Sequence, residues 1–137
     1  DHLKGKDDAV IVTVTSGLAF VPLVDAPTYC ATKAAIHSYT LSLRNALDGK
    51  VEVIELAPPG VQTTLTPGQE KRSMYQPLDD FADEVMRLFG EQPTPKQILV
   101  ERVRGFRNAE RDGNFDATMK QLNDFARKAR EEGNASA

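Results

Sequence analysis

Residues 9–15 read AVIVTVT, an unbroken run of small and β-branched residues. A strand covered on both faces, as in a parallel sheet, has this composition because neither face needs polar side chains. Residues 51–57, VEVIELA, predict a second strand. Between them, residues 28–47 repeat apolar side chains at helical spacing, and Asp48-Gly49 supplies a glycine stop. This order predicts a βαβ unit with parallel strands and a right-handed crossover.

Beyond the second strand the pattern becomes mainly helical. Residues 78–89 predict a helix, with aspartates in its first turn, where the helix dipole favours them. Residues 97–103 predict a third strand that runs into a turn of helix, and residues 115–131 an amphipathic helix. Residues 132–137 predict a frayed, disordered tail. The expected fold class is α/β, with about three strands and flanking helices.

Composition narrows the range of functions. A net charge of -3 gives no electrostatic case for nucleic acid or for an anionic membrane as a partner. No apolar run is long enough to span a bilayer, and the first residues lack a signal-peptide pattern. The single cysteine, Cys30, excludes an internal disulfide and favours a reducing, cytoplasmic location. We expect Cys30 to be a buried small residue. We expect His37 to have a packing or surface role, Tyr39 to lie on the packed face of its helix, and Phe125 to lie in the core.

A tyrosine and a lysine stand one helical turn apart in PTYCATKAA, residues 27–35. Tyr29 and Lys33 therefore share a helix face, where the ammonium would favour the phenolate and prepare the phenol for proton transfer. An ordinary surface pair is the alternative interpretation. Ser16 strengthens the functional one, because it directly follows the first strand, and ligand sites in α/β sheets lie beyond the carboxyl ends of strands.

The succession strand, Ser16, loop, YCATK, helix, strand and PPGVQT resembles the short-chain dehydrogenase/reductase (SDR) family. The segments SGLAFVPL, KAAIHSYTLSLR and ILVERVRGFRNAERDGNFDAT are most similar to a DltE-like branch of it. The resemblance implies a Rossmann-like doubly wound parallel sheet. Residues 1–131 would then be the C-terminal part of such a domain, without its N-terminal dinucleotide-binding half.

In that family Tyr29 would be the catalytic acid/base, and Lys33 would favour its ionised form and bind the nicotinamide ribose. Ser16 would bind and polarise the carbonyl of the substrate, which would be a carbonyl compound or an alcohol. The cofactor implied is NADP or NAD.

The family's loop after the second strand reads Pro-Gly-x-Val/Ile-x-Thr. Its alignment with this chain implies cofactor contacts at Pro59, Val61 and Thr63, with Pro59 in place of the usual glycine. A shift by one residue, which uses Gly60 and Thr64, is the competing alignment. Residues 65–77 would be a substrate lid or, as the alternative, a plain surface loop.

The glycine-rich turn that binds dinucleotide phosphates is absent from these residues. Two further hypotheses therefore stand beside the enzymatic one: a non-catalytic, self-assembling or interaction module that binds no dinucleotide, and cofactor-free proton transfer. The family sheet would continue beyond residues 9–15, so that strand would become an exposed edge. We therefore expect a homo-oligomer, such as a dimer, or assembly with the missing N-terminal half.

Overall fold

The computed structural model describes residues 1–47 and 49–135. Its centre is a parallel sheet of β1 (Val10–Val14), β2 (Glu52–Leu56) and β3 (Gln97–Ile98), in the order β1-β2-β3. The α/β fold class is confirmed, and the three-stranded sheet with its helices is consistent with part of a Rossmann-like domain.

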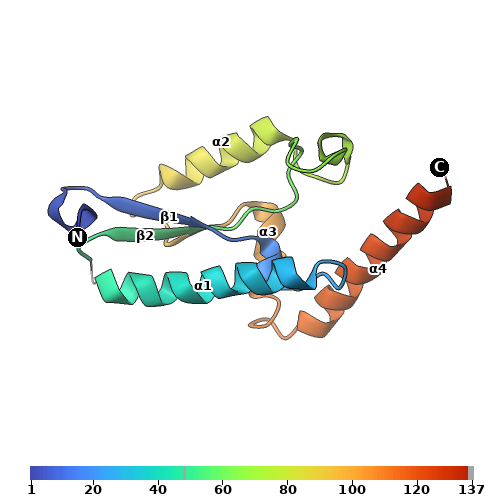
Figure 1. Ribbon diagram of the computed structural model, residues 1–137, viewed down its shortest axis with the longest axis horizontal. Coiled ribbons are helices and arrows are strands. Elements are labelled where there is room, and N and C mark those ends of the chain that lie inside the picture. The colour runs from blue at the N-terminus through green and yellow to red at the C-terminus, as the bar shows by residue number, and fades with distance from the viewer. Residues whose placement is uncertain (48, 136–137) are drawn as a thin grey trace.

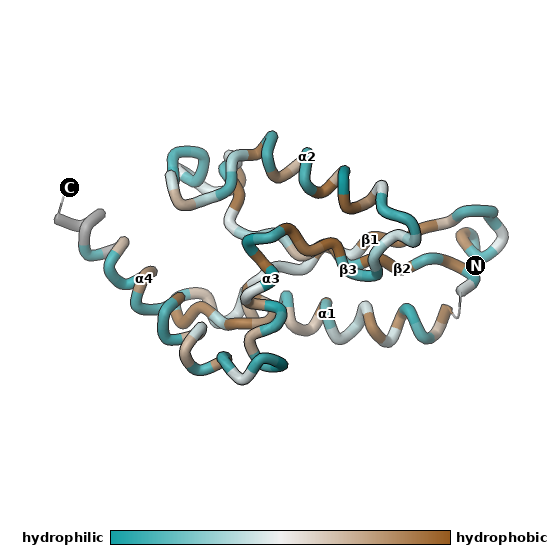
Figure 2. The backbone as a smooth tube through the Cα atoms, turned by 180° about the vertical axis from the view of Figure 1, so that it is seen from behind, coloured by the Kyte–Doolittle hydropathy of each residue, from teal (hydrophilic) through white to brown (hydrophobic). Residues whose placement is uncertain are grey.

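Helices cover both faces of this sheet. The helices are α1 (Pro27–Leu47), α2 (Leu78–Phe89), α3 (Glu101–Asn108) and α4 (Phe115–Ala135), with 3₁₀ turns η1 (Leu3–Gly5), η2 (Gly17–Ala19) and η3 (Gln69–Lys71). Figure 1 shows α1 on one side of the sheet and α2 on the other, while α4 projects away from the body. The strands carry much of the hydrophobic sequence between the helices (Figure 2).

The predicted βαβ unit is present. Helix α1 opens with Pro27, whose fixed φ suits a first helical position. It ends at Leu47, and Gly49 follows with φ 73°, a left-handed conformation that favours glycine. Asp48, the other half of the predicted stop, lies outside the described residues. The helix returns the chain so that β1 and β2 run parallel, with Val12 opposite Ile54.

The hydrophobic core has two parts, one on each face of β2. On the α2 side, a cluster joins strand and helix residues: Ile54, Ala57, Val85, Leu88, Ile98, Val100 and Val103. On the α1 side, Leu47, Val51 and Val53 form a smaller cluster. Alternate residues of one strand serve both clusters because successive side chains of a strand point to opposite faces. Strand β2 is therefore the central element of the fold.

Strand β1 is the exposed edge that the sequence predicts. Its pairing with β2 continues at both ends, where Ala9 accepts a hydrogen bond from Glu52 N–H and Thr15 N–H donates to Leu56 O. On its other side no described strand pairs with it. Its alternate side chains Val10, Val12 and Val14 are each between 43% and 48% exposed. They lie on the same face of the sheet as Ile54 but are far less covered.

The third strand is shorter than the predicted span of residues 97–103. It stops at Ile98, and α3 begins at Glu101, whose N–H donates to Glu84 Oε1 at 2.7 Å. A carboxylate from α2 thus satisfies one of the free donors at the start of a helix, and this favours the helix over a longer strand.

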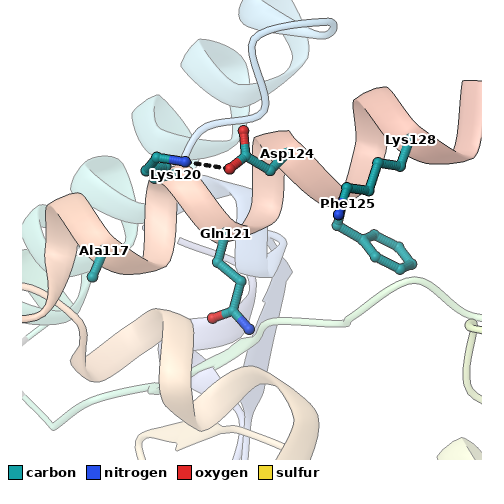
Figure 3. Close-up of a pocket in the computed structure, with 6 residues that line it drawn as sticks. All are labelled: Ala117, Lys120, Gln121, Asp124, Phe125 and Lys128. Carbon is teal, nitrogen blue, oxygen red and sulfur yellow. Dashed lines mark hydrogen bonds and ion pairs between the residues drawn. The ribbon is translucent and has the colours of Figure 1, made fainter. Parts of the chain in front are cut away.

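Helix α4 continues to Ala135, past the predicted end at residue 131, and residues 136–137 lie outside the described part of the chain. Its attachment to the body includes Asn123, whose amide accepts from Val24 N–H and donates to Pro22 O. Figure 3 shows the exposed side of α4, where Lys120 and Asp124 form an ion pair and Phe125 lies beside Lys128. Phe125 is 50% exposed, so the expectation of a core position is wrong.

Candidate active site

Ser16 stands in a turn that the sheet holds tightly. The parallel pairing between β1 and β2 continues beyond the end of β1. Thr15 N–H donates to Leu56 O at 2.8 Å, and Gly17 N–H donates to Pro58 O at 2.9 Å. Ser16 is 7% exposed, and its Oγ accepts a hydrogen bond of 3.1 Å from Leu18 N–H. Nothing in the described part of the chain accepts the hydroxyl proton of Ser16, so that proton can be donated, as polarisation of a carbonyl oxygen would require.

Lys33 lies at the same end of β1. Its ammonium donates a hydrogen bond of 3.0 Å to the carbonyl oxygen of Val14, two residues before Ser16. The same ammonium lies 5.7 Å from the centre of the Tyr29 ring, within the range of a cation–π contact. Tyr29 is 46% exposed, and its hydroxyl has no hydrogen-bond partner among the described residues. Helix α1 and β1 thus bring the phenol, the ammonium and the serine turn to one edge.

The loop after β2 reaches this edge too. Gly17 N–H is bound to Pro58 O, so the serine turn and the loop start side by side. The loop then folds back on itself: Val61 forms a parallel bridge with Gln76, and Gln76 N–H donates to Gly60 O at 2.9 Å. A side chain on Gly60 would have its Cβ 2.8 Å from the Tyr75 ring, so this close approach requires glycine.

The predicted cofactor residues occupy distinct positions in that loop. Pro59 is half-buried and Val61 is buried, with the Val61 carbonyl accepting a hydrogen bond of 2.8 Å from Gln69 Nε2. The same amide donates to Thr63 Oγ1 at 2.9 Å. Thr64, the threonine of the competing alignment, is exposed. The segment 65–77 contains η3 and packs back on the loop through Gln76 and Gln69.

Sequence reasoning missed a buried polar network directly below the site. Glu55 on β2 is fully buried and accepts hydrogen bonds from Thr15 Oγ1 at 2.8 Å and Gln97 Nε2 at 2.7 Å. His37 Nδ1 lies 2.9 Å from Glu55 Oε2 and 3.0 Å from Oε1. The available signal was an acidic residue, Glu55, between the apolar Ile54 and Leu56 of β2. His37, expected to have only a packing or surface role, is the partner of that carboxylate.

Two other expectations concern α1. Cys30 is buried, as predicted, and its Sγ accepts a hydrogen bond of 3.3 Å from Leu23 N–H. Tyr39, expected on the packed face of the helix, is 62% exposed, because the helix turns Thr40 and His37 toward the sheet instead. Within residues 1–47 and 49–135 no group of side chains has the composition of a metal site. No helix in the same residues is long and apolar enough to cross a membrane.

Comparison with known proteins finds similarity to dehydrogenases and oxidoreductases. The family model for short chain dehydrogenases matches residues 1–73. The uncharacterized oxidoreductase DltE of Bacillus subtilis (strain 168) is 43% identical over 125 residues, which cover 89% of this chain and 49% of that protein. Estradiol 17-beta-dehydrogenase 2 of Mus musculus is 30% identical over 101 residues, which cover 72% of this chain and 26% of that protein.

The chain therefore spans about half the length of the first of these curated relatives and less of the second. No solved structure matches it. The family match covers the segment that contains β1, the serine turn, α1, β2 and the loop that follows. On this match, the chain belongs to the short-chain dehydrogenase family.

Proposed function

We propose that this chain is the part of an NAD(P)-dependent oxidoreductase that bears the catalytic residues, and that it acts on a carbonyl or alcohol group. Tyr29 is the acid/base, Lys33 supports it, and Ser16 holds the substrate oxygen. The observation that carries the proposal is the hydrogen bond from Lys33 to Val14 O, which brings the ammonium over the Tyr29 ring at the end of β1. We also propose a cytoplasmic location, because the single cysteine, Cys30, can form no internal disulfide.

The donor set at this edge fits one end of a dinucleotide. Lys33 uses one of its three N–H donors on Val14 O, and the Tyr29 hydroxyl is unengaged among the described residues. Both can therefore bind ribose hydroxyls. Val61 offers its backbone N–H, since its carbonyl already accepts from Gln69. Thr63 Oγ1 accepts from Gln69 Nε2 and Leu65 N–H, and among the described residues nothing accepts its hydroxyl proton. A nicotinamide cofactor, when bound, supplies or accepts the hydride.

Residues of this chain carry out the proton transfer. In the reducing direction, Ser16 Oγ–H donates a hydrogen bond to the substrate carbonyl oxygen and polarises the bond. Tyr29 gives its phenolic proton to that oxygen as negative charge develops on it, and becomes a phenolate. The ammonium of Lys33 stabilises that phenolate electrostatically. In the oxidising direction, Tyr29 removes the alcohol proton by the reverse step.

The direct test is Tyr29→Phe, which removes the proton donor but keeps the ring. We expect turnover of carbonyl substrates to fall at least about a thousandfold, within the range for loss of a general acid, with the circular dichroism spectrum unchanged. Tyr39→Phe is the matched control, because Tyr39 is an exposed tyrosine on the same helix. An active Tyr29→Phe variant would show that the acid/base has been assigned wrongly.

A second candidate function rests on the edge of β1. An unpaired edge strand with exposed valines favours assembly with another chain, so the module would associate without binding a dinucleotide. Calorimetric titration of NADPH and NADH into the chain, with its mass measured in the same buffer, separates the two. Micromolar binding supports the oxidoreductase. A well-folded oligomer that binds neither supports the assembly module.

A further inference from the structure

A buried carboxylate links the two elements that carry the candidate site. Glu55 is enclosed on β2, and each of its hydrogen-bond partners comes from a different part of the fold: Thr15 at the end of β1, His37 on α1 and Gln97 on β3. A buried charge is tolerated only where such partners replace water. We call these four residues the Glu55 network.

Thr15 connects the network to the serine turn. It is 1% exposed and immediately precedes Ser16. Its N–H is bound to Leu56 O and its hydroxyl to Glu55 Oε1, so both its backbone and its side chain are fixed to β2. The direction in which the chain leaves β1, and hence the position of Ser16 Oγ, follows from these two hydrogen bonds.

His37 connects the network to α1, the helix that carries Tyr29. It lies one turn after Lys33 on α1, on the same face. Its ring is bound to Glu55 on one side and meets the Phe20 ring edge-on, with 5.1 Å between centroids. Two consecutive turns of α1 are thus tied to the sheet, through Lys33 on Val14 and through His37 on Glu55.

Gln97 has its orientation fixed from outside the network. Arg107 Nε on α3 donates to Gln97 Oε1 at 2.9 Å, so the amide must present Nε2 to Glu55. The guanidinium of Arg107 also lies 5.2 Å from the centre of the Phe20 ring. With Glu55 ionised, its oxygens only accept, so His37 Nδ1 carries the hydrogen. Thr15, His37 and Gln97 then each donate a hydrogen bond to the carboxylate.

We propose that Glu55 and His37 are positioning residues that set the relative placement of Ser16 and the Tyr29–Lys33 pair. This rests on the function proposed above. The group that holds the substrate oxygen comes from the end of β1, whereas the groups that deliver the proton come from α1. Glu55 is hydrogen-bonded to residues of both elements, so it fixes the distance between Ser16 and the Tyr29–Lys33 pair. A displacement of about 1 Å in such a constellation can cost about a hundredfold in rate.

The fold offers a matched control for a purely structural role. Thr13 on β1 and Thr40 on α1 also join these two elements, with 2.8 Å between their hydroxyl oxygens, and Thr40 is fully buried. This pair lies farther along α1, away from Tyr29. Thr13 stands opposite Glu55 in the β1–β2 pairing, but among the described residues neither threonine hydroxyl is hydrogen-bonded to a member of the Glu55 network. Loss of either the Thr13–Thr40 contact or the His37–Glu55 contact should loosen α1 from the sheet. Only loss of the His37–Glu55 contact should affect the site.

The experiment compares His37→Leu, His37→Asn and Thr40→Val in the chain. His37 is the residue to change because its side chain is 21% exposed, whereas replacing the enclosed Glu55 risks the fold. We expect His37→Leu to lower kcat about ten- to a hundredfold with KM within about twofold of the parent. His37→Asn should recover most of kcat, because the asparagine amide can donate from near the position of Nδ1. Thr40→Val should lower the midpoint of unfolding and leave kcat unchanged.

Hydrogen exchange gives a readout that does not depend on turnover. The Gly17 and Leu18 amides, bound to Pro58 O and Ser16 Oγ, report on the serine turn. We expect their exchange to quicken in His37→Leu and not in Thr40→Val. Equal effects of the two variants on kcat, or on these amides, would overturn the proposal. If Tyr29→Phe were fully active, the proposed function would fail, yet the exchange result would still decide whether the network orders the turn.

Discussion

The ammonium of Lys33 donates a hydrogen bond of 3.0 Å to the carbonyl oxygen of Val14, the last residue of the edge strand. A carbonyl group that no described strand pairs with is thereby satisfied by a side chain of the proposed site. The contact gives Lys33 two roles. It holds the start of α1 against the sheet, and it keeps a positive charge beside the Tyr29 ring.

Replacing Lys33 by methionine should separate these roles from simple packing, because methionine keeps the length of the side chain but not its charge. We expect turnover to fall about a hundredfold or more, within the range for loss of acid/base support. Stability should fall by about 0.5–1.5 kcal/mol, the typical contribution of one hydrogen bond. Lys50→Met is the control at an exposed position. Steady-state kinetics and denaturant unfolding check both, and unchanged kinetics would remove Lys33 from the mechanism.

The exposed edge predicts how the chain associates. Val12→Lys places a charge in the middle of β1, on a side chain that is 43% exposed. Lysine on an edge strand disfavours the addition of another strand. We expect the mass measured by light scattering to shift toward the monomer. Leu65→Lys, at an 83% exposed loop position, should leave the mass unchanged. A monodisperse monomer in the parent chain would contradict the expectation of self-assembly at the outset.

The close approach of Gly60 to the Tyr75 ring leads to a prediction about the stability of the loop after β2. A methyl group there would lie 2.8 Å from two atoms of the Tyr75 ring, closer than van der Waals contact allows. Gly60→Ala should therefore cost about 1–3 kcal/mol, as overpacking does. Gly105→Ala in α3 meets nothing within 4 Å and should stabilise the chain by up to about 1 kcal/mol. Thermal unfolding of both variants tests the pair, and equal shifts would show that Tyr75 does not hold the loop.

The ion pair on α4 predicts a dependence on pH. The hydrogen bond from Lys120, opposed by desolvation and aided by the charges of Lys120 and Arg127, holds the pKa of Asp124 below its ordinary 3.8. A lowered pKa in the folded chain means that this contribution to stability is fully present above pH 3.8 and disappears as the pH falls through the folded pKa. NMR titration of Asp124 should show a midpoint below 3.8, and Lys120→Met should raise it.

Local pattern was enough to predict much of this fold. The strand–helix–strand unit and helix α2 are where the sequence places them, because each depends on side chains that are close together in the chain. The candidate residues Ser16, Tyr29 and Lys33 follow from the same elements. Patterns of this kind carry the period of an element and the residues that end it.

Contacts between distant residues could not be predicted in this way. The third strand stops early because Glu84 captures the N–H of Glu101, and neither residue signals the other in sequence. The partners of Glu55 lie 18, 40 and 42 residues away from it. Tyr39 and Phe125 were misplaced because helical spacing defines an apolar stripe without showing how much of it a neighbour covers.

The alternation along β1 makes the strand intolerant of a change in length. Ala9 and Thr15 bond to β2, whereas Val14, of opposite parity, offers its carbonyl to Lys33. Deleting one residue from the middle of β1 would exchange the residues whose backbone groups face β2 with those whose backbone groups face the free edge. The valines would turn toward α1, and the backbone group that Lys33 needs would face β2 instead. Indels within these five residues should therefore be far more damaging than any single substitution among them.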